Sequence, residues 1–112
     1  MSKSTEEVIR EQISSNDVLL YMKGTPEAPE CGFSAATVKA LQNTGYAFSY
    51  VNILASPFIR ERLPSISNWP TYPQLFVKGE LVGGCDIVLE MVNDGSLNSL
   101  LASASGTAEA AN

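Results

Sequence analysis

The sequence feature that most constrains the fold is a short apolar run, VLLYM, at Val18–Met22. Turn-forming and polar residues bound the run on both sides, and no charged residue interrupts it. Such a run is typical of a strand that is buried on both faces of a sheet. With 112 residues, of which 45% are apolar, the chain is long enough for one hydrophobic core and too short for two. We therefore predict a single domain.

A helix and a second strand are predicted after this run. Residues 33–45 place Phe33, Val38 and Leu41 at helical spacing and end in a glycine, a common helix stop. Residues 46–53 alternate between apolar and polar side chains as a strand does. With the first strand they form a strand-helix-strand unit, in which the crossover should be right-handed and the strands parallel.

The next segments predict a short helix and a hairpin. The stretch Ser56–Pro64 fits a helix that Ser56 caps and that ends before Pro64. The strand-like segments Gln74–Val77 and Glu80–Gly84 are joined by a Lys-Gly pair, which suits the tight turn of an antiparallel hairpin. The hairpin thus adds antiparallel strands to the parallel pair.

Helices are predicted at both ends of the chain. Ser4 or Thr5 can cap a helix with two glutamates in its first turn, where acids interact favourably with the helix dipole. Asp86 can cap a later helix that has an apolar face and extends as far as Ala102. Residues 103–112 are small and polar, with nothing to bury, and we expect them to form a disordered tail.

The layout as a whole, strand-helix-strand followed by hairpin-helix, is that of the thioredoxin fold. We predict an α/β domain over residues 1–102, with a four-stranded mixed sheet flanked by helices and an extra helix at the N-terminus. The sequence contains no internal repeat and no linker that would divide the chain.

The composition excludes several kinds of chemistry. The formal net charge is −5 and lysines and arginines are not clustered, so we expect no nucleic-acid partner. The chain has no histidine, which excludes Cys-His dyads, serine triads and histidine-bound metals. Two cysteines, Cys31 and Cys85, are too few for a disulfide scaffold.

The sequence also predicts no contact with a membrane. No apolar run approaches the roughly 20 residues that cross a bilayer. The first residues, MSKSTEEVIR, lack both the apolar core of a signal peptide and the character of an arginine-rich presequence. We therefore expect a soluble, cytoplasmic protein of bacterial type.

Cys31 is the main candidate for chemistry. The first strand ends at Met22 and the second helix begins near Gly32, so the cysteine lies where helix N–H groups are unpaired and the dipole favours a thiolate. Lys23 follows the strand and can add positive charge. A lone intracellular cysteine can also be a small buried hydrophobic residue. The position of Cys31 near Lys23 favours a reactive or ligating thiolate.

Ser34 stands where a redox dithiol would carry its second cysteine. A hydroxyl cannot release Cys31 from a mixed disulfide, so another thiol has to do so, and free glutathione is the obvious candidate. Ser34 can equally be a first-turn residue that suits the capping geometry of the helix. The two roles are compatible.

Three stretches of the sequence resemble one known family. CGFS at Cys31–Ser34, its lead-in KGTPEAPE and the later NWPTYPQLFVKGELVGGCD are similar to the monothiol glutaredoxins of the CGFS type, in particular the small single-domain bacterial form. The resemblance implies a glutathione site in which Lys23 and Arg60 contact the glycine carboxylate of glutathione, as cationic donors can. The alternative for both residues is a solvated surface charge.

The resemblance assigns two further parts of this glutathione site. It implies a cis bond before Pro73, where the main chain of Tyr72 pairs with glutathione, although the residues alone favour the trans form. It also implies that Cys85 and Asp86 hold the γ-glutamyl end, with the carboxylate facing the ammonium. Asp86 should in addition be an ordinary helix N-cap. Cys85 is either a buried thiol, the role we favour, or a resolving partner for Cys31 under oxidation.

The resemblance further implies a metal-cluster function. A 2Fe-2S cluster takes four thiolate ligands. Two copies of Cys31 and two glutathiones would supply them in a homodimer that carries the cluster for delivery to apo iron-sulfur proteins or for sensing. The resemblance also implies heterodimers with BolA-type proteins.

Two other functions are considered beside the cluster carrier. One is a glutathione-dependent monothiol oxidoreductase that removes glutathione from protein thiols through Cys31, an activity that the resemblance implies to be weak. The other is a non-redox interaction module on the same scaffold, against which Cys31 and Lys23 argue. Phe33 and Trp69 are left unassigned, because each can pack in the core or lie beside the site.

Overall fold

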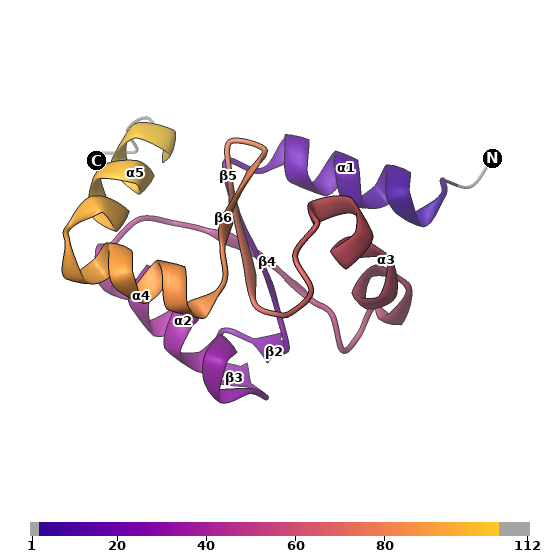
Figure 1. The fold of residues 1–112 in the computed structure, drawn as a ribbon, viewed down its shortest axis with the longest axis horizontal. Coiled ribbons are helices and arrows are strands. Elements are labelled where there is room, and N and C mark those ends of the chain that lie inside the picture. Colours follow the sequence, from indigo (N-terminus) through magenta and orange to yellow (C-terminus); the bar gives the residue numbers. More distant parts are fainter. Residues whose placement is uncertain (1–2, 106–112) are drawn as a thin grey trace.

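The computed structural model describes residues 3–105 as a layered α/β structure (Figure 1). In chain order the elements are α1 (Thr5–Ser15), β1 (Val18–Met22), β2 (Gly24–Thr25), β3 (Ala28–Pro29), α2 (Gly32–Thr44), β4 (Ser49–Asn52), α3 (Pro57–Ser67), β5 (Gln74–Val77), β6 (Glu80–Gly83), α4 (Cys85–Asn93) and α5 (Ser96–Ser105). None of the helices in this part of the chain has both the length and the apolar character needed to cross a bilayer.

Strand β1 lies inside a four-stranded mixed sheet with the order β4-β1-β5-β6. It pairs in parallel with β4 and antiparallel with β5, and β5 forms the predicted antiparallel hairpin with β6. β4 is shorter than the predicted segment 46–53, because its ladder with β1 extends only over Leu19–Met22. β2 and β3 form a separate small hairpin in the loop before α2, which the sequence did not predict.

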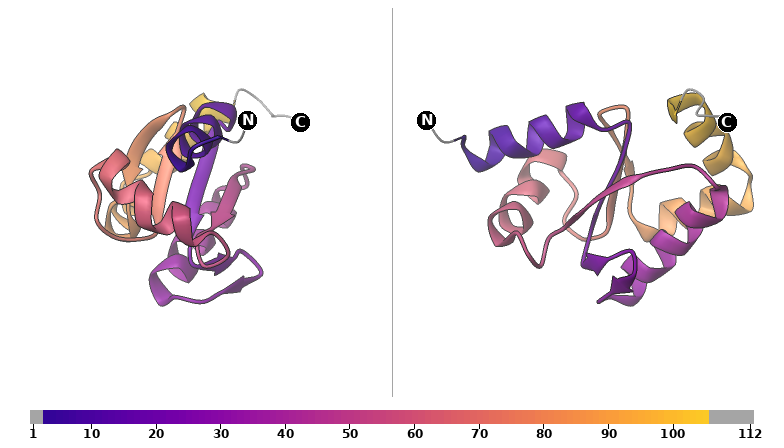
Figure 2. Two further views of the ribbon diagram at one scale, coloured as in Figure 1. Left: turned by 90° about the vertical axis from the view of Figure 1, so that its right-hand side faces the viewer. Right: turned by 180° about the vertical axis from the view of Figure 1, so that it is seen from behind.

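Helices cover both faces of the sheet and enclose separate hydrophobic clusters (Figures 1 and 2). Helices α2, α4 and α5 pack on one face, over Val18 and the alternate residues that follow it in β1. Helices α1 and α3 pack on the other, over Leu19 and Tyr21. The Tyr21 ring meets Phe76 edge-on, with centroids 5.7 Å apart. The thioredoxin-like fold with an extra N-terminal helix is therefore confirmed, as is the burial of β1 on both faces.

Several local predictions are also confirmed. Ser4, rather than Thr5, caps α1: its hydroxyl accepts a hydrogen bond from the Glu7 N–H at 3.1 Å, and the Glu7 carboxylate accepts one from the Ser4 N–H at 2.8 Å. Helix α2 stops at Gly45, which has a φ of 82°. The Lys78-Gly79 pair, with φ of 52° and 83°, closes the hairpin as a tight turn.

The prediction that Asp86 caps α4 was wrong. The helix begins at Cys85 and its N-cap is Gly84, so Asp86 already lies in the first turn. The reason is that Gly83, with a φ of 148°, and Gly84 complete the change from strand to helix within two residues. The exposed Asp86 carboxylate still lies at the positive end of the helix dipole.

The prediction that Pro64 ends the short helix was also wrong. Helix α3 continues through Pro64 to Ser67 and stops at Asn68, which has a φ of 58°. A proline inside a helix leaves the carbonyl four residues earlier without its N–H donor. Here the Tyr72 hydroxyl donates a hydrogen bond to the Arg60 carbonyl at 2.8 Å, and this contact from outside the helix supplies the missing partner.

The segment predicted as one helix up to Ala102 forms two helices. Gly95, with a φ of 83°, separates α4 from α5. Helix α5 passes the predicted domain boundary and buries Ala104, so residues 103–105 belong to the folded domain. The remainder of the expected tail, residues 106–112, lies outside the described residues.

Two glycines with positive φ allow a test of this fold. A Cβ at Gly83 would approach the Cβ of Ile87 to 2.8 Å, whereas a Cβ at Gly79 would meet nothing within 4 Å. We expect Gly79→Ala to lower the free energy of unfolding by about 1 kcal/mol through backbone strain alone. Gly83→Ala should lower it by roughly 3 kcal/mol, because the clash adds to the strain. Urea unfolding measures both, and equal effects would contradict the close packing of β6 on α4.

Candidate functional site

A groove lies at the edge of the sheet where β1 and β6 end and β5 begins. It consists of two adjoining hollows of about 400 Å³ and about 360 Å³. Both are lined by Phe33, Thr71 and Tyr72. Every site residue that the sequence predicted lines one or both hollows: Lys23, Cys31, Arg60 and Tyr72 the first, and Tyr72, Cys85 and Asp86 the second.

Cys31 occupies the N-terminal end of α2. It is the N-cap residue of the helix and is partly exposed, which excludes the alternative of a small buried hydrophobic residue. Hydrogen bonding from the backbone N–H of Ser34 lowers the pKa of the Cys31 thiol below its usual range. The Phe33 N–H, the Ser34 hydroxyl and the Lys23 ammonium act in the same direction, and partial burial opposes them. The arrangement favours a thiolate, the form that attacks disulfides and binds metals.

Ser34 joins this helix to the end of β1. Its side chain is fully buried, and its hydroxyl accepts a hydrogen bond from the Lys23 N–H at 3.1 Å. The Lys23 carbonyl in turn accepts one from the Glu30 N–H at 2.9 Å. The hydroxyl therefore serves the strand end and does not cap α2, so the capping role considered for Ser34 is not the one found.

The two ends of the groove carry opposite charge. Lys23 and Arg60 lie at the end nearer Cys31. Within residues 3–105, neither of them forms an ion pair, whereas Arg62 on the same helix pairs with Glu6. The exposed Asp86 carboxylate lies at the other end. The arrangement suits a ligand with an anionic group at one end and a cationic group at the other.

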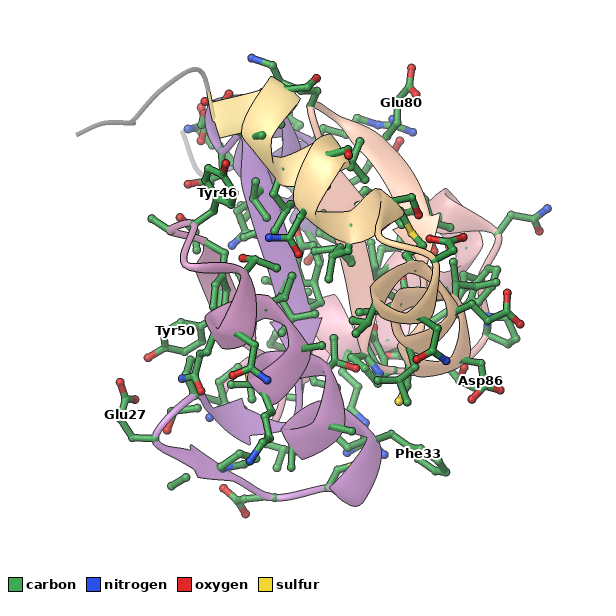
Figure 3. All side chains as sticks on the ribbon, turned by 90° about the vertical axis from the view of Figure 1, so that its left-hand side faces the viewer. Glu27, Phe33, Tyr46, Tyr50, Glu80 and Asp86 are labelled. Carbon is green, nitrogen blue, oxygen red and sulfur yellow. The ribbon has the colours of Figure 1, made fainter. Side chains whose placement is uncertain are left out.

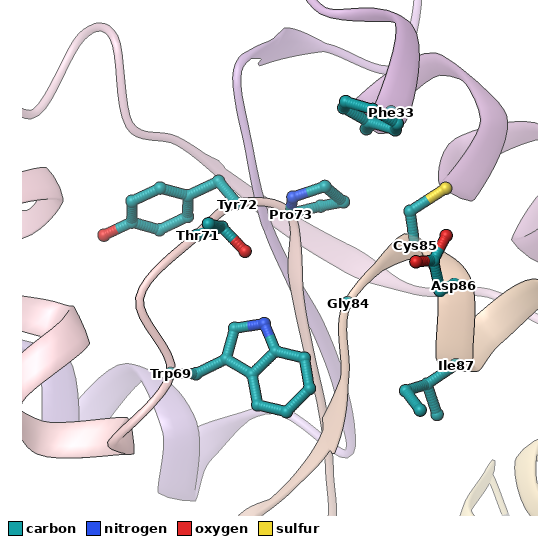
Figure 4. Close-up of a pocket in the computed structure, with 9 residues that line it drawn as sticks. All are labelled: Phe33, Trp69, Thr71, Tyr72, Pro73, Gly84, Cys85, Asp86 and Ile87. Carbon is teal, nitrogen blue, oxygen red and sulfur yellow. The ribbon is translucent and has the colours of Figure 1, made fainter.

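The loop between α3 and β5 forms the floor of the groove (Figure 4). The bond between Tyr72 and Pro73 is cis, as the resemblance implied and contrary to the form that the residues alone favour. In the described part of the chain, the main-chain groups of Tyr72 have no hydrogen-bond partner. They are therefore available to pair with an extended peptide.

Gln74 supports the groove, although the sequence analysis did not predict this role. It is fully buried, and its side-chain amide donates hydrogen bonds to the carbonyls of Trp69 at 3.0 Å and Thr71 at 3.2 Å. These bonds hold the loop in place. A single amide in the otherwise apolar strand QLFV was the available signal, because a buried polar side chain needs hydrogen-bond partners.

Packing brings this loop close to the start of α4. A Cβ at Gly84 would approach the Pro73 carbonyl oxygen to 3.1 Å and the indole nitrogen of Trp69 to 3.2 Å. That nitrogen is buried and has no hydrogen-bond partner among the described residues. Trp69 therefore packs against the start of α4, and a side chain at position 84 would require the loop to shift.

Phe33 and Cys85 face each other across the groove. The Phe33 side chain is 64% exposed, so of the two roles left open for it, packing in the core is not the one found (Figure 3). Cys85 is buried, in agreement with the role we favoured, and it lines the same hollow as Phe33 (Figure 4). Phe33 thus lines the opening of the groove beside Cys31.

Comparisons with known proteins agree with this fold and site. A family model described as Glutaredoxin matches residues 18–82. The chain is 58% identical over 93 residues to Glutaredoxin 4 of Buchnera aphidicola, covering 83% of this chain and 86% of the relative. It is 57% identical over 98 residues to Glutaredoxin 4 of Escherichia coli K12, covering 88% and 85%.

A solved structure gives the same result. The solution structure of reduced poplar apo GrxS14 superposes with a TM-score of 0.78 at 38% identity, covering 93% of this chain and 95% of that chain. The match of the family model includes Cys31, Arg60 and Tyr72, which the groove brings together. On the fold, the groove and these relatives, the chain belongs to the glutaredoxin family.

Proposed function

We propose that the protein is a CGFS-type monothiol glutaredoxin that binds glutathione in the groove and, as a homodimer, carries a 2Fe-2S cluster for delivery to apo iron-sulfur proteins. The observation that carries the proposal is the position of Cys31. Its thiol is partly exposed, has a lowered pKa and lies in the same hollow as the cationic Lys23 and Arg60. A serine stands where a second thiol would otherwise compete for it.

Glutathione matches the groove end to end. Its glycine carboxylate would bind Lys23 and Arg60, which lack acidic partners in the described chain. Its γ-glutamyl carboxylate would accept hydrogen bonds at the start of α4, and its ammonium would face Asp86. The cysteinyl main chain would pair with Tyr72, as in strand addition. This pose brings the glutathione sulfur beside Cys31.

The cluster is cargo for this site. Within residues 3–105, no group of three or more potential ligands (His, Cys, Asp or Glu) is close enough to hold a metal ion. Cys31 offers one thiolate, so two chains with two bound glutathiones reach the four thiolates that a two-iron cluster takes. Ligands that are partly small molecules can leave, which suits transfer to a recipient protein. A BolA-type protein in place of the second chain would supply ligands of its own.

The lowered pKa of Cys31 also favours a second function, glutathione-dependent disulfide exchange. The Cys31 thiolate would attack the glutathione sulfur of a glutathionylated protein, join to it and release the protein thiolate. A second glutathione thiolate would then attack that disulfide, which regenerates Cys31 and forms glutathione disulfide. Ser34 cannot perform this second step, so the reaction depends on free glutathione.

The charge at one end of the groove gives a first test. Arg60→Ala should weaken glutathione binding roughly tenfold, because it removes a charge-assisted contact to the glycine carboxylate. Arg62→Ala is the matched control, since Arg62 lies on the same helix but pairs with Glu6. Calorimetric titration with glutathione measures both. Equal affinities in the two variants would contradict the assigned orientation of glutathione.

The thiolate at Cys31 gives a second test. Because the pKa of Cys31 is lowered, the rate of alkylation should reach half its maximum at a lower pH in the folded protein than in urea. Ser34→Ala should move this midpoint upwards and reduce the free energy of unfolding by about 1 kcal/mol, since the Lys23 N–H loses its acceptor. Ser65→Ala removes an exposed hydroxyl outside the groove and should change neither quantity by a comparable amount. An unchanged midpoint in Ser34→Ala would contradict the role given to Ser34.

Reconstitution tests the proposed function as a whole. Iron, sulfide and glutathione are added without oxygen, and visible absorption and size exclusion are recorded on the same sample. We expect a coloured dimer that requires glutathione, is abolished by Cys31→Ser and persists in Cys85→Ser, whose thiol is buried. A colourless monomer would contradict the carrier function. Turnover on a glutathionylated substrate would then decide on the oxidoreductase.

A further inference from the structure

A hydrogen bond from outside α3 replaces one that the helix lacks. The Tyr72 hydroxyl donates to the Arg60 carbonyl at 2.8 Å and lies 3.4 Å from the Ile59 carbonyl oxygen. In an uninterrupted helix the Arg60 carbonyl would accept from the N–H of residue 64. Residue 64 is proline, which has no N–H. The side chain of Tyr72 is thus the donor for the turn that carries Arg60.

Tyr72 is well suited to act as this donor. Burial raises the pKa of Tyr72 to about 12, so its hydroxyl keeps its proton at neutral pH. Its ring packs against the hydrophobic cluster beneath α1 and α3, and its side chain points away from Cys85 and Phe33 (Figure 4). Tyr72 therefore contributes its main chain to the floor of the groove, whereas its side chain contacts helix α3.

The position of Arg60 depends on few other contacts. Its side chain is exposed and, within the described residues, has no ion pair, so no acidic side chain holds the guanidinium in place. The orientation of the Arg60 side chain therefore depends on the backbone of its helical turn. That turn is weakened by Pro64 and linked to the loop at Tyr72.

We propose that Tyr72 is a positioning residue, whose hydroxyl holds the Arg60 turn of α3 against the loop and so sets the affinity of the groove for the glycine carboxylate of glutathione. The inference rests on the proposed glutathione function and deepens it. It concerns the side chain of Tyr72, a different group from the main chain that pairs with glutathione.

Four proteins test the proposal: wild type, Tyr72→Phe, Pro64→Ala and the double variant. Tyr72→Phe should weaken glutathione binding by about threefold to tenfold, the range expected for loss of one hydrogen bond. With alanine at position 64, the helix again has an N–H for the Arg60 carbonyl. The same change at Tyr72 should then weaken binding by less than about twofold. Calorimetric titration gives each affinity.

A second ligand separates positioning from general loosening. γ-Glutamylcysteine lacks the glycine carboxylate, so Tyr72→Phe should leave its affinity within about twofold of the wild type. Tyr50→Phe removes a hydroxyl from the edge strand β4, outside the groove, and should change the affinity for neither ligand. Thermal unfolding of every variant establishes that it is folded.

Three results would overturn the proposal. These are unchanged glutathione affinity in Tyr72→Phe, an equal loss in the proline and alanine backgrounds, or an equal loss for the two ligands. A wild type that binds neither ligand would instead refute the proposed glutathione function, and the role of Tyr72 would fall with it. The two failures are distinguished by the wild-type titration alone.

Discussion

The burial of β1 on both faces is the constraint on which the rest of the structure depends. Its side chains alternate between the two hydrophobic clusters, so helices are needed on each side of the sheet. Where the strand leaves this packing, the Lys23 main chain is held by hydrogen bonds to Ser34 and Glu30. The first turn of α2, which begins beside Cys31, is therefore linked through Ser34 to the end of the most buried strand.

The groove depends on hydrogen bonds that side chains donate to main-chain carbonyls. Gln74 holds two carbonyls of the loop between α3 and β5, and Tyr72 holds one carbonyl of α3. Gly84, between β6 and α4, allows the backbone to approach Trp69 closely. These contacts fix the position of the loop between α3 and β5 relative to α3 and α4, and so define the shape of the groove.

The serine at position 34, in place of the second cysteine of a C-x-x-C motif, is consistent with this geometry. Ser34 is fully buried and its hydroxyl is bonded to the end of β1, so the residue that replaces the second thiol has a structural task. The pKa of Cys31 is lowered, and position 34 holds no thiol with which Cys31 could form a disulfide. The thiolate is then free for a partner from outside the chain, which is the property that both proposed functions require.

The sequence by itself determined the elements that depend on close neighbours. The apolar run at Val18–Met22, the Ser4 cap and the Lys78-Gly79 turn were all predicted from residues within a few positions of each other. Of the site, Cys31, its helix N-terminus and the nearby positive charge of Lys23 were predicted in the same way. The remaining site residues required the family resemblance, because nothing local indicates that distant segments meet at one edge of the sheet.

Only the tertiary structure decided the features whose partners are distant in the chain. Pro64 ends a helix by local rules, yet α3 continues to Ser67, and the Tyr72 hydroxyl bonds to the Arg60 carbonyl that Pro64 leaves without a donor. Phe33 has core spacing, yet it is exposed because the groove opens beside it. In each case the local sequence indicates the conformation or environment that a residue favours. Packing between distant segments determines which groups the residue contacts.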